Sequence, residues 1–147
     1  MYYAIAFHCL GGCSKSELDS IQVLQNRAAR FVLNYPPRSN RAQMFYKLGW
    51  LTVRQIAAYH SLVLVHQIRI SKEPEYLAAK LNRVNCNNNI VLKNTPLDLY
   101  RNSFVYRSSL LWNKLPHSMR EDKDKKSFKN NVKKWIRENF ERFERTL

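Results

Sequence analysis

The chain has 147 residues, the length of one ordinary domain, and its 45% hydrophobic and 12% aromatic content excludes an intrinsically disordered protein. Three glycines argue against a β-sandwich or barrel, and three cysteines argue against a disulfide framework, which favours a reducing, intracellular compartment. A formal charge of +14 exceeds what solubility requires and favours a polyanionic partner.

The first ten residues form an apolar run, MYYAIAFHCL. This run is too short to span a membrane, and it lacks the basic residues that begin a signal peptide. We interpret it as an internal core segment, which suggests that the chain is a fragment of something larger.

The first helix is predicted to start at Ser14 and to stop at Pro36–Pro37. Ser14 and Glu17 have the spacing of a capping box, and the residue before a proline avoids helical geometry. Apolar residues recur at helical intervals and form one stripe, made of Leu18, Ile21, Leu24, Ala28, Phe31 and Tyr35. The other sides carry Gln22, Gln25, Asn26, Arg27 and Arg30.

A second, shorter helix is predicted over 41–48. Ser39 or Asn40 can cap its start, and Gly49 follows it where a left-handed residue is favoured.

A third helix is predicted to begin at the capping-box pair Thr52 and Gln55 and to reach about Arg69. Its apolar residues cover a wide arc of the helix, so we expect it to be central and buried.

A minor helical turn is predicted over 74–81, followed by an Asn-rich stretch over 82–96 without periodicity. This stretch is longer than compact domains usually need, which favours a functional loop or an insertion.

Helical periodicity returns at Ser103 and continues to Pro116, with Val105, Trp112 and Leu110 or Leu111 on the apolar side. Residues 120–126 are predicted to be a solvated linker. Ser127 can cap a last helix, whose apolar side carries Phe128, Val132, Trp135, Phe140 and Phe143. The prediction is an all-α protein, a single helical domain of about five helices with one long Asn-rich loop.

Four segments resemble the C-terminal region of non-LTR retrotransposon reverse transcriptases of the jockey and chicken-repeat type. They are LDSIQVLQNRAARFVL, FYKLGWLTVRQ, FVYRSSLLWNKLP and SFKNNVKKW, in this order after a Tyr-rich apolar run. The most specific pieces are 24–28 with Arg30, and 108–116 followed by 127–129. The resemblance covers nearly the whole chain. We expect one helical domain over 1–147, with thumb-like helices over 1–81 as the resemblance implies, an irregular connection over 82–102 and C-terminal helices over 103–147.

The resemblance also implies a function, because the thumb of these polymerases grips the template–primer duplex behind the catalytic site. The polymerase aspartates belong to the palm, where paired carboxylates hold two metal ions. No such pair occurs in this sequence, where the aspartates are scattered at Asp19, Asp98, Asp122 and Asp124. We therefore expect no catalytic residues and no enzyme activity, only a binding role.

The basic residues support this expectation, because no Asp or Glu occurs from Ser20 to Lys72. Arginine contacts phosphate oxygens in a forked geometry, so the primary candidates for nucleic-acid binding are Arg27, Arg30, Arg38 and Arg41. The secondary candidates are Lys129, Lys133 and Lys134, although nearby acids make a solvated surface equally plausible there. Gln22, Gln25 and Asn26 could add neutral donors to backbone or sugar.

Aromatic residues could stack on unpaired bases, but most lie on predicted apolar faces, so core packing is the better interpretation. The set is Tyr35, Tyr46, Trp50, Tyr59, Tyr106, Trp112 and Trp135. Tyr35, beside Arg38, stays open as a stacking residue.

A zinc site is disfavoured because His8, Cys9 and Cys13 lack a fourth ligand at suitable spacing. No cofactor or metal is expected.

The primary hypothesis is sequence-nonspecific binding of an RNA–DNA hybrid or DNA duplex by backbone charge. The alternative is a structural or protein-interaction remnant that self-associates or binds the missing polymerase palm. A membrane-surface role ranks third, and no membrane partner is expected. The sequence does not distinguish a nuclear from a cytoplasmic location.

Overall fold

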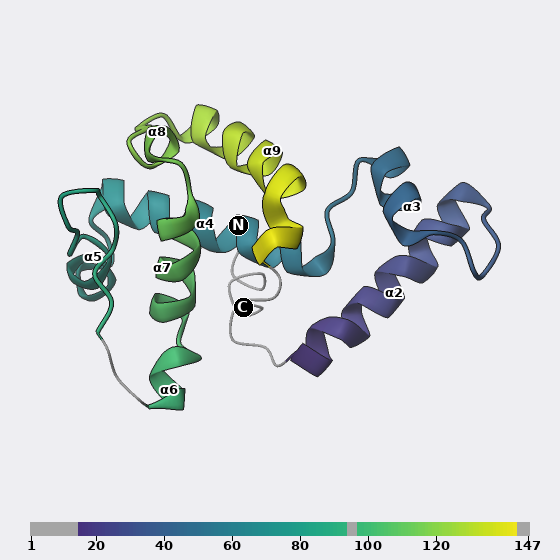
Figure 1. The fold of residues 1–147 in the computed structure, drawn as a ribbon, viewed down its shortest axis with the longest axis horizontal. Coiled ribbons are helices and arrows are strands. Elements are labelled where there is room, and N and C mark those ends of the chain that lie inside the picture. The colour runs from purple at the N-terminus through teal and green to yellow at the C-terminus, as the bar shows by residue number, and fades with distance from the viewer. Residues whose placement is uncertain (1–14, 94–96, 144–147) are drawn as a thin grey trace.

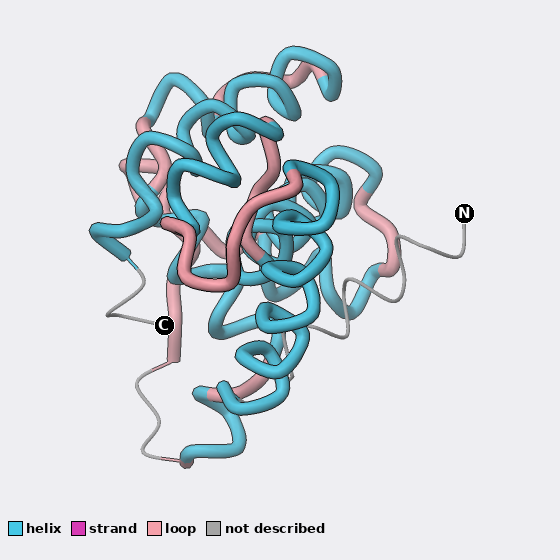
Figure 2. Tube along the Cα trace, turned by 90° about the vertical axis from the view of Figure 1, so that its right-hand side faces the viewer, coloured by secondary structure: helices cyan, strands magenta, loops and turns pink. Residues whose placement is uncertain are grey.

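The computed structural model describes residues 15–93 and 97–143, and within these ranges the chain is all-α. Apart from a long connection between α5 and α6, short loops join the helices, and the described residues contain one isolated antiparallel bridge, between Val84 and Ile90 (Figure 2). The described residues form eight helices: α2 Lys15–Leu33, α3 Arg41–Leu48, α4 Val53–Ser71, α5 Glu75–Leu81, α6 Asp98–Arg101, α7 Phe104–Lys114, α8 His117–Arg120 and α9 Lys125–Phe143.

The predicted count of about five helices was too low. The five expected helices correspond to α2, α3, α4, α7 and α9, and the predicted turn over 74–81 forms α5. The remaining two, α6 and α8, have four residues each. A single turn is too short to show helical periodicity, which is why the sequence did not indicate them.

Helix α4 runs through the middle of the molecule, with α7 and α9 packed against it and α5 at one end (Figure 1). Its buried residues include Leu62, Val65 and Ile68, which confirms the predicted central position. The side chains that complete this core come from several helices and the 82–93 loop: Ala58, Ala78, Leu81, Ile90, Leu111, Trp112, Leu115, Phe128, Val132, Trp135 and Ile136.

The start of α4 follows the predicted local signal. The Thr52 hydroxyl accepts from the Gln55 backbone N–H, and the Gln55 side chain accepts from the Thr52 N–H at 2.9 Å. The helix continues past Arg69 to Ser71 and ends where Lys72 adopts a left-handed φ of 60°.

Helices α2 and α3 form a separate unit at the opposite end of α4 from α5 (Figure 1). Its small core contains Ala29, Met44 and Phe45. Of the two predicted caps for α3, Asn40 is the one used, since its side chain accepts from the Ala42 N–H at 2.9 Å. Gly49 has the expected left-handed φ, 64°.

The end of α2 differs from the prediction in its mechanism. Asn34 adopts a left-handed φ of 52°, and the Tyr35 N–H donates to the Arg30 carbonyl at 3.0 Å. This is the hydrogen bonding of a Schellman termination. The helix therefore ends at Leu33, and the prolines at 36 and 37 are not what terminates it.

The apolar stripe of α2 faces away from the rest of the described structure. Leu24 is 61% exposed and Phe31 is 88% exposed, whereas Gln22 and Ala29 are buried. The amide of Gln22 faces inward because it accepts a hydrogen bond from the Val53 backbone N–H, at 2.9 Å. A distant backbone donor thus overrides the hydrophobic pattern of the helix.

The predicted linker over 120–126 has an ordered role, because its aspartates cap α9. Asp124 accepts from the Ser127 N–H at 2.7 Å, so Asp124 takes the capping position that was predicted for Ser127. The Ser127 hydroxyl instead donates to Asp122 at 2.6 Å, and this hydrogen bond lowers the pKa of the Asp122 carboxyl. Phe128, Val132 and Trp135 are buried as predicted, together with Ile136. The side chains of Phe140 and Phe143 lie outside the described residues.

Candidate nucleic-acid interface

The four predicted arginines all belong to the α2–α3 unit. Arg27 and Arg30 lie about one turn apart on α2, Arg38 lies in the connection, and Arg41 begins α3. Arg27, Arg38 and Arg41 are exposed and Arg30 is half-buried. We call these four residues the arginine cluster. Among the described residues, none of them forms an ion pair with a carboxylate.

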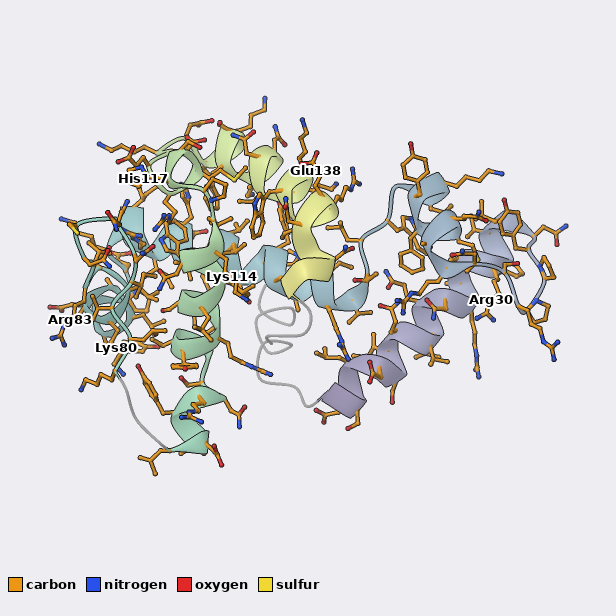
Figure 3. All side chains as sticks on the ribbon, in the orientation of Figure 1. Arg30, Lys80, Arg83, Lys114, His117 and Glu138 are labelled. Carbon is orange, nitrogen blue, oxygen red and sulfur yellow. The ribbon has the colours of Figure 1, made fainter. Side chains whose placement is uncertain are left out.

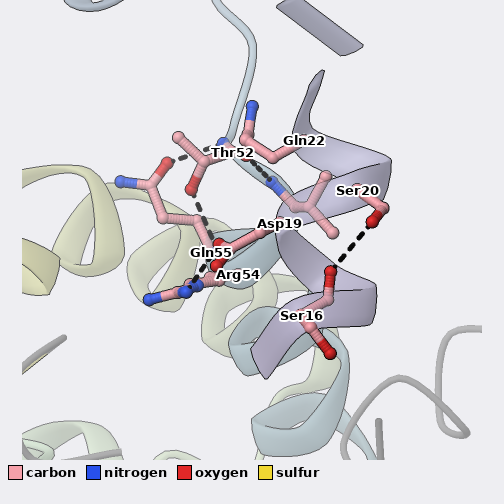
Figure 4. Close-up of polar contacts among 8 residues, drawn as sticks. Ser16, Asp19, Ser20, Gln22, Thr52, Arg54 and Gln55 are labelled. Carbon is pink, nitrogen blue, oxygen red and sulfur yellow. Dashed lines mark hydrogen bonds and ion pairs between the residues drawn. The ribbon is translucent and has the colours of Figure 1, made fainter. Parts of the chain in front are cut away.

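Other cations of the acid-free stretch are used inside the fold. Arg54 on α4 forms an ion pair with Asp19 on α2 at 2.7 Å, beside the Thr52–Gln55 cap (Figure 4). Arg69 lies over the Trp112 ring, 4.8 Å from its centroid. These contacts distinguish structural arginines from the arginine cluster, a distinction that composition alone does not make.

The lysines of α9 approach the same part of the molecule. Lys129, Lys133 and Arg137 are spaced by four residues and so share one helical face. The Arg137 guanidinium donates to the Gly49 carbonyl, at the end of α3, at 2.6 Å. This row of cations therefore contacts the α2–α3 unit through Arg137. Of the three predicted lysines, Lys133 and Lys134 are exposed and Lys129 is half-buried.

Arg137 was not among the predicted site residues. Its contact joins residues 88 positions apart, and only a folded chain reveals it. Lys47 was also missed. Its ammonium lies 5.4 Å from the centroid of the Tyr35 ring and 3.4 Å from the Tyr35 hydroxyl.

The aromatic residues divide between core and surface. Trp112 and Trp135 are buried as predicted, but Tyr46 on α3 is 91% exposed, so its predicted core position was wrong. Helix α3 buries Met44 and Phe45 instead, and the following residue faces outward. Tyr35 is half-buried against the α2–α3 core, with Lys47 beside its ring.

The neutral donors expected beside the arginines serve the fold instead. The Gln25 amide donates to the Leu51 carbonyl at 2.8 Å, and the Gln22 amide donates to Gln25 and Asn26 at 3.0 Å each. These side chains connect α2 to the start of α4. Their predicted role at nucleic-acid backbone or sugar stays a prediction.

The cations of the chain are spread along its length. Arg30 lies at the opposite end of the molecule from Lys80 and Arg83 (Figure 3). Two well-separated basic regions are useful experimentally, because charge can be removed from either one alone.

Within the described part of the chain, no three His, Cys, Asp or Glu side chains form a group that could hold a metal ion. His8, Cys9 and Cys13, as well as the apolar run over 1–10 and Ser14, lie outside that part. Among the helices of 15–93 and 97–143, none has the length and apolar character needed to cross a bilayer.

Comparison with known proteins found no matching family model, no matching curated protein and no matching solved structure.

Proposed function

We propose that the chain binds the sugar-phosphate backbone of template–primer nucleic acid through the arginine cluster, continued by Lys129, Lys133 and Lys134 of α9. The observation that carries this proposal is that four arginines from one helical unit have no carboxylate partner among the described residues. Unpaired guanidinium groups repel one another, and phosphate oxygens relieve that repulsion.

The proposed binding is sequence-nonspecific. Backbone charge supplies most of the affinity of nonspecific complexes, and sequence is read only by contacts to base edges. Exposed Tyr46 next to Lys47 adds a ring that can stack on an unpaired base at the end of a duplex. The expected ligand is an RNA–DNA hybrid or a DNA duplex.

The resemblance to non-LTR reverse transcriptases gives this binding a biological setting. The chain corresponds in our proposal to a catalytically incomplete C-terminal fragment, comprising the thumb and the region beyond it. The sequence lacks the paired aspartates of a palm, so the proposal includes no polymerase activity.

The test is binding of the full chain to three duplexes of unrelated sequence, measured by fluorescence anisotropy at one salt concentration. Replacing the arginine cluster with Gln is expected to weaken all three complexes about equally. A matched control removes four exposed cations elsewhere, with Lys80→Gln, Arg83→Gln, Lys93→Gln and Arg101→Gln. Equal losses in the two quadruple variants would show that net charge alone, and not the cluster, determines the affinity.

A second candidate function is a protein-interaction module, and the exposed stripe of α2 favours it. Ile21, Leu24, Ala28 and Phe31 have the alternating spacing of a coiled-coil seam, and none is charged. We propose a second copy of the chain as the occupant. In an antiparallel pair, Glu17 in the first turn of one copy faces the basic end of the other.

Light scattering at low and high salt tests this second function. A dimer that Leu24→Gln with Phe31→Gln converts to a monomer supports it. Val23→Gln is the matched control, because Val23 is exposed on α2 but lies off the stripe. A wild-type monomer at both salt concentrations would exclude self-association through α2.

A further inference from the structure

Two arginines outside the arginine cluster lie together beneath the 82–93 loop. Arg69 on α4 donates to the Asn88 side chain at 2.6 Å. Arg120, the last residue of α8, donates to the Asn87 carbonyl at 3.0 Å and also to the Asn89 side chain. Because these acceptors belong to consecutive residues, the two guanidinium groups are close neighbours.

Neither arginine forms an ion pair with a carboxylate within the described part of the chain. All the acceptors that these arginines have among the described residues are neutral amide or carbonyl oxygens. Burial lowers the pKa of the Arg69 guanidinium, and the charge of Arg120 lowers it further. The fold therefore brings two like charges together at a cost that these neutral oxygens offset only in part.

Several donors in this region have no acceptor among the described residues. They are Nη1 of Arg69, Nε of Arg120 and Nε1 of Trp112, all buried. Trp112 is only 1% exposed, and the Arg69 guanidinium lies over its ring. A buried donor without an acceptor is destabilising, so a group that supplied acceptors here would stabilise the protein.

We propose that Arg69 and Arg120 form a binding site for one phosphate oxyanion between α4, α8 and the 82–93 loop. A tetrahedral phosphate offers several acceptor oxygens and negative charge, which matches two forked guanidinium groups. The loop above the arginines is exposed at Asn87 and half-buried at Asn88 and Asn89, so the site lies close to solvent. This inference does not rest on the proposed function, because no residue of the arginine cluster takes part.

The test is a titration of the full chain with inorganic phosphate, with chloride adjusted to hold the ionic strength constant. The readouts are the indole N–H resonance of Trp112 and the thermal midpoint. We expect a saturable shift of that resonance and a rise in the midpoint. The indole signals of Trp50 and Trp135 serve as internal references and should stay in place.

Two variants of Arg120 and one control locate the binding. Arg120→Gln removes the charge but retains an amide that can donate to the loop, and it should weaken phosphate binding about tenfold or more. Arg120→Lys keeps the charge without the fork and should give an intermediate affinity. Arg83→Gln, at an exposed position within the loop, should bind as the wild type does.

The proposal is wrong if phosphate shifts the Trp112 resonance no more than chloride does at the same ionic strength. It is also wrong if Arg120→Gln binds phosphate with wild-type affinity. A competing DNA duplex identifies the source of the phosphate. Displacement of inorganic phosphate indicates a site for nucleic-acid backbone, and simultaneous binding indicates a site for a free phosphate. Both results support the site. Because the site contains no residue of the arginine cluster, an arginine-cluster variant that loses duplex binding should still bind inorganic phosphate.

Discussion

His66 is the buried residue whose chemistry responds most directly to pH. Its ring stacks on Phe128 with centroids 3.9 Å apart, and its Nε2 is 2.7 Å from the Asp122 carbonyl oxygen. Because a carbonyl only accepts, Nε2 carries the proton in this contact. Burial lowers the pKa of the His66 imidazole, so the folded protein favours the neutral ring.

The chain should therefore lose stability as the pH falls below the ordinary histidine range. The unfolded chain takes up the proton first, because its His66 pKa is the higher one, and this favours unfolding. Urea midpoints at pH 7.5 and pH 5.5 measure the effect. His66→Gln, which retains a donor, should reduce the difference between the two midpoints. A difference between the two midpoints that is as large in His66→Gln as in the wild type would contradict the account.

At the scale of elements, the orientation of α2 depends on polar contacts with α4, and the buried one is made by Gln22. Replacing Gln22 with Leu removes the acceptor of the buried Val53 N–H. Since a buried donor without an acceptor costs about 1–3 kcal/mol, we expect the free energy of unfolding to fall by that order. Gln43→Leu, at an exposed position of α3, is the control. Equal stability of the two variants in urea would mean that Gln22 does not fix the helix.

How well each helix could be predicted depends on how far apart in sequence the interacting residues lie. The caps at Asn40 and Thr52 were predicted because each side chain accepts from a backbone amide two or three residues away. The exposed face of α2 was not predicted, because its inward side is chosen by residues of another helix. For the same reason the sequence did not indicate the contact of Arg137 with Gly49, since these residues are 88 positions apart.

At the scale of the whole molecule, a charge of +14 on 147 residues opposes compaction. Added salt screens this repulsion between exposed charges, so the isolated chain should become more stable as NaCl rises from 50 to 300 mM. Urea unfolding at both concentrations, without nucleic acid or phosphate, measures the change. A lower free energy of unfolding at the higher concentration would show that attractive ion pairs, and not repulsion, dominate the surface.

The most direct test of the proposed function is the salt dependence of binding to an RNA–DNA hybrid. Each phosphate contact contributes about 0.9 to the slope of log affinity against log salt, so losing four contacts should flatten the slope by about 3 to 4. We predict this change when Arg27, Arg30, Arg38 and Arg41 are replaced with Gln, and a wild-type slope when Lys80, Arg83, Lys93 and Arg101 are replaced instead. The same slope in both variants would contradict a phosphate-binding surface on α2 and α3.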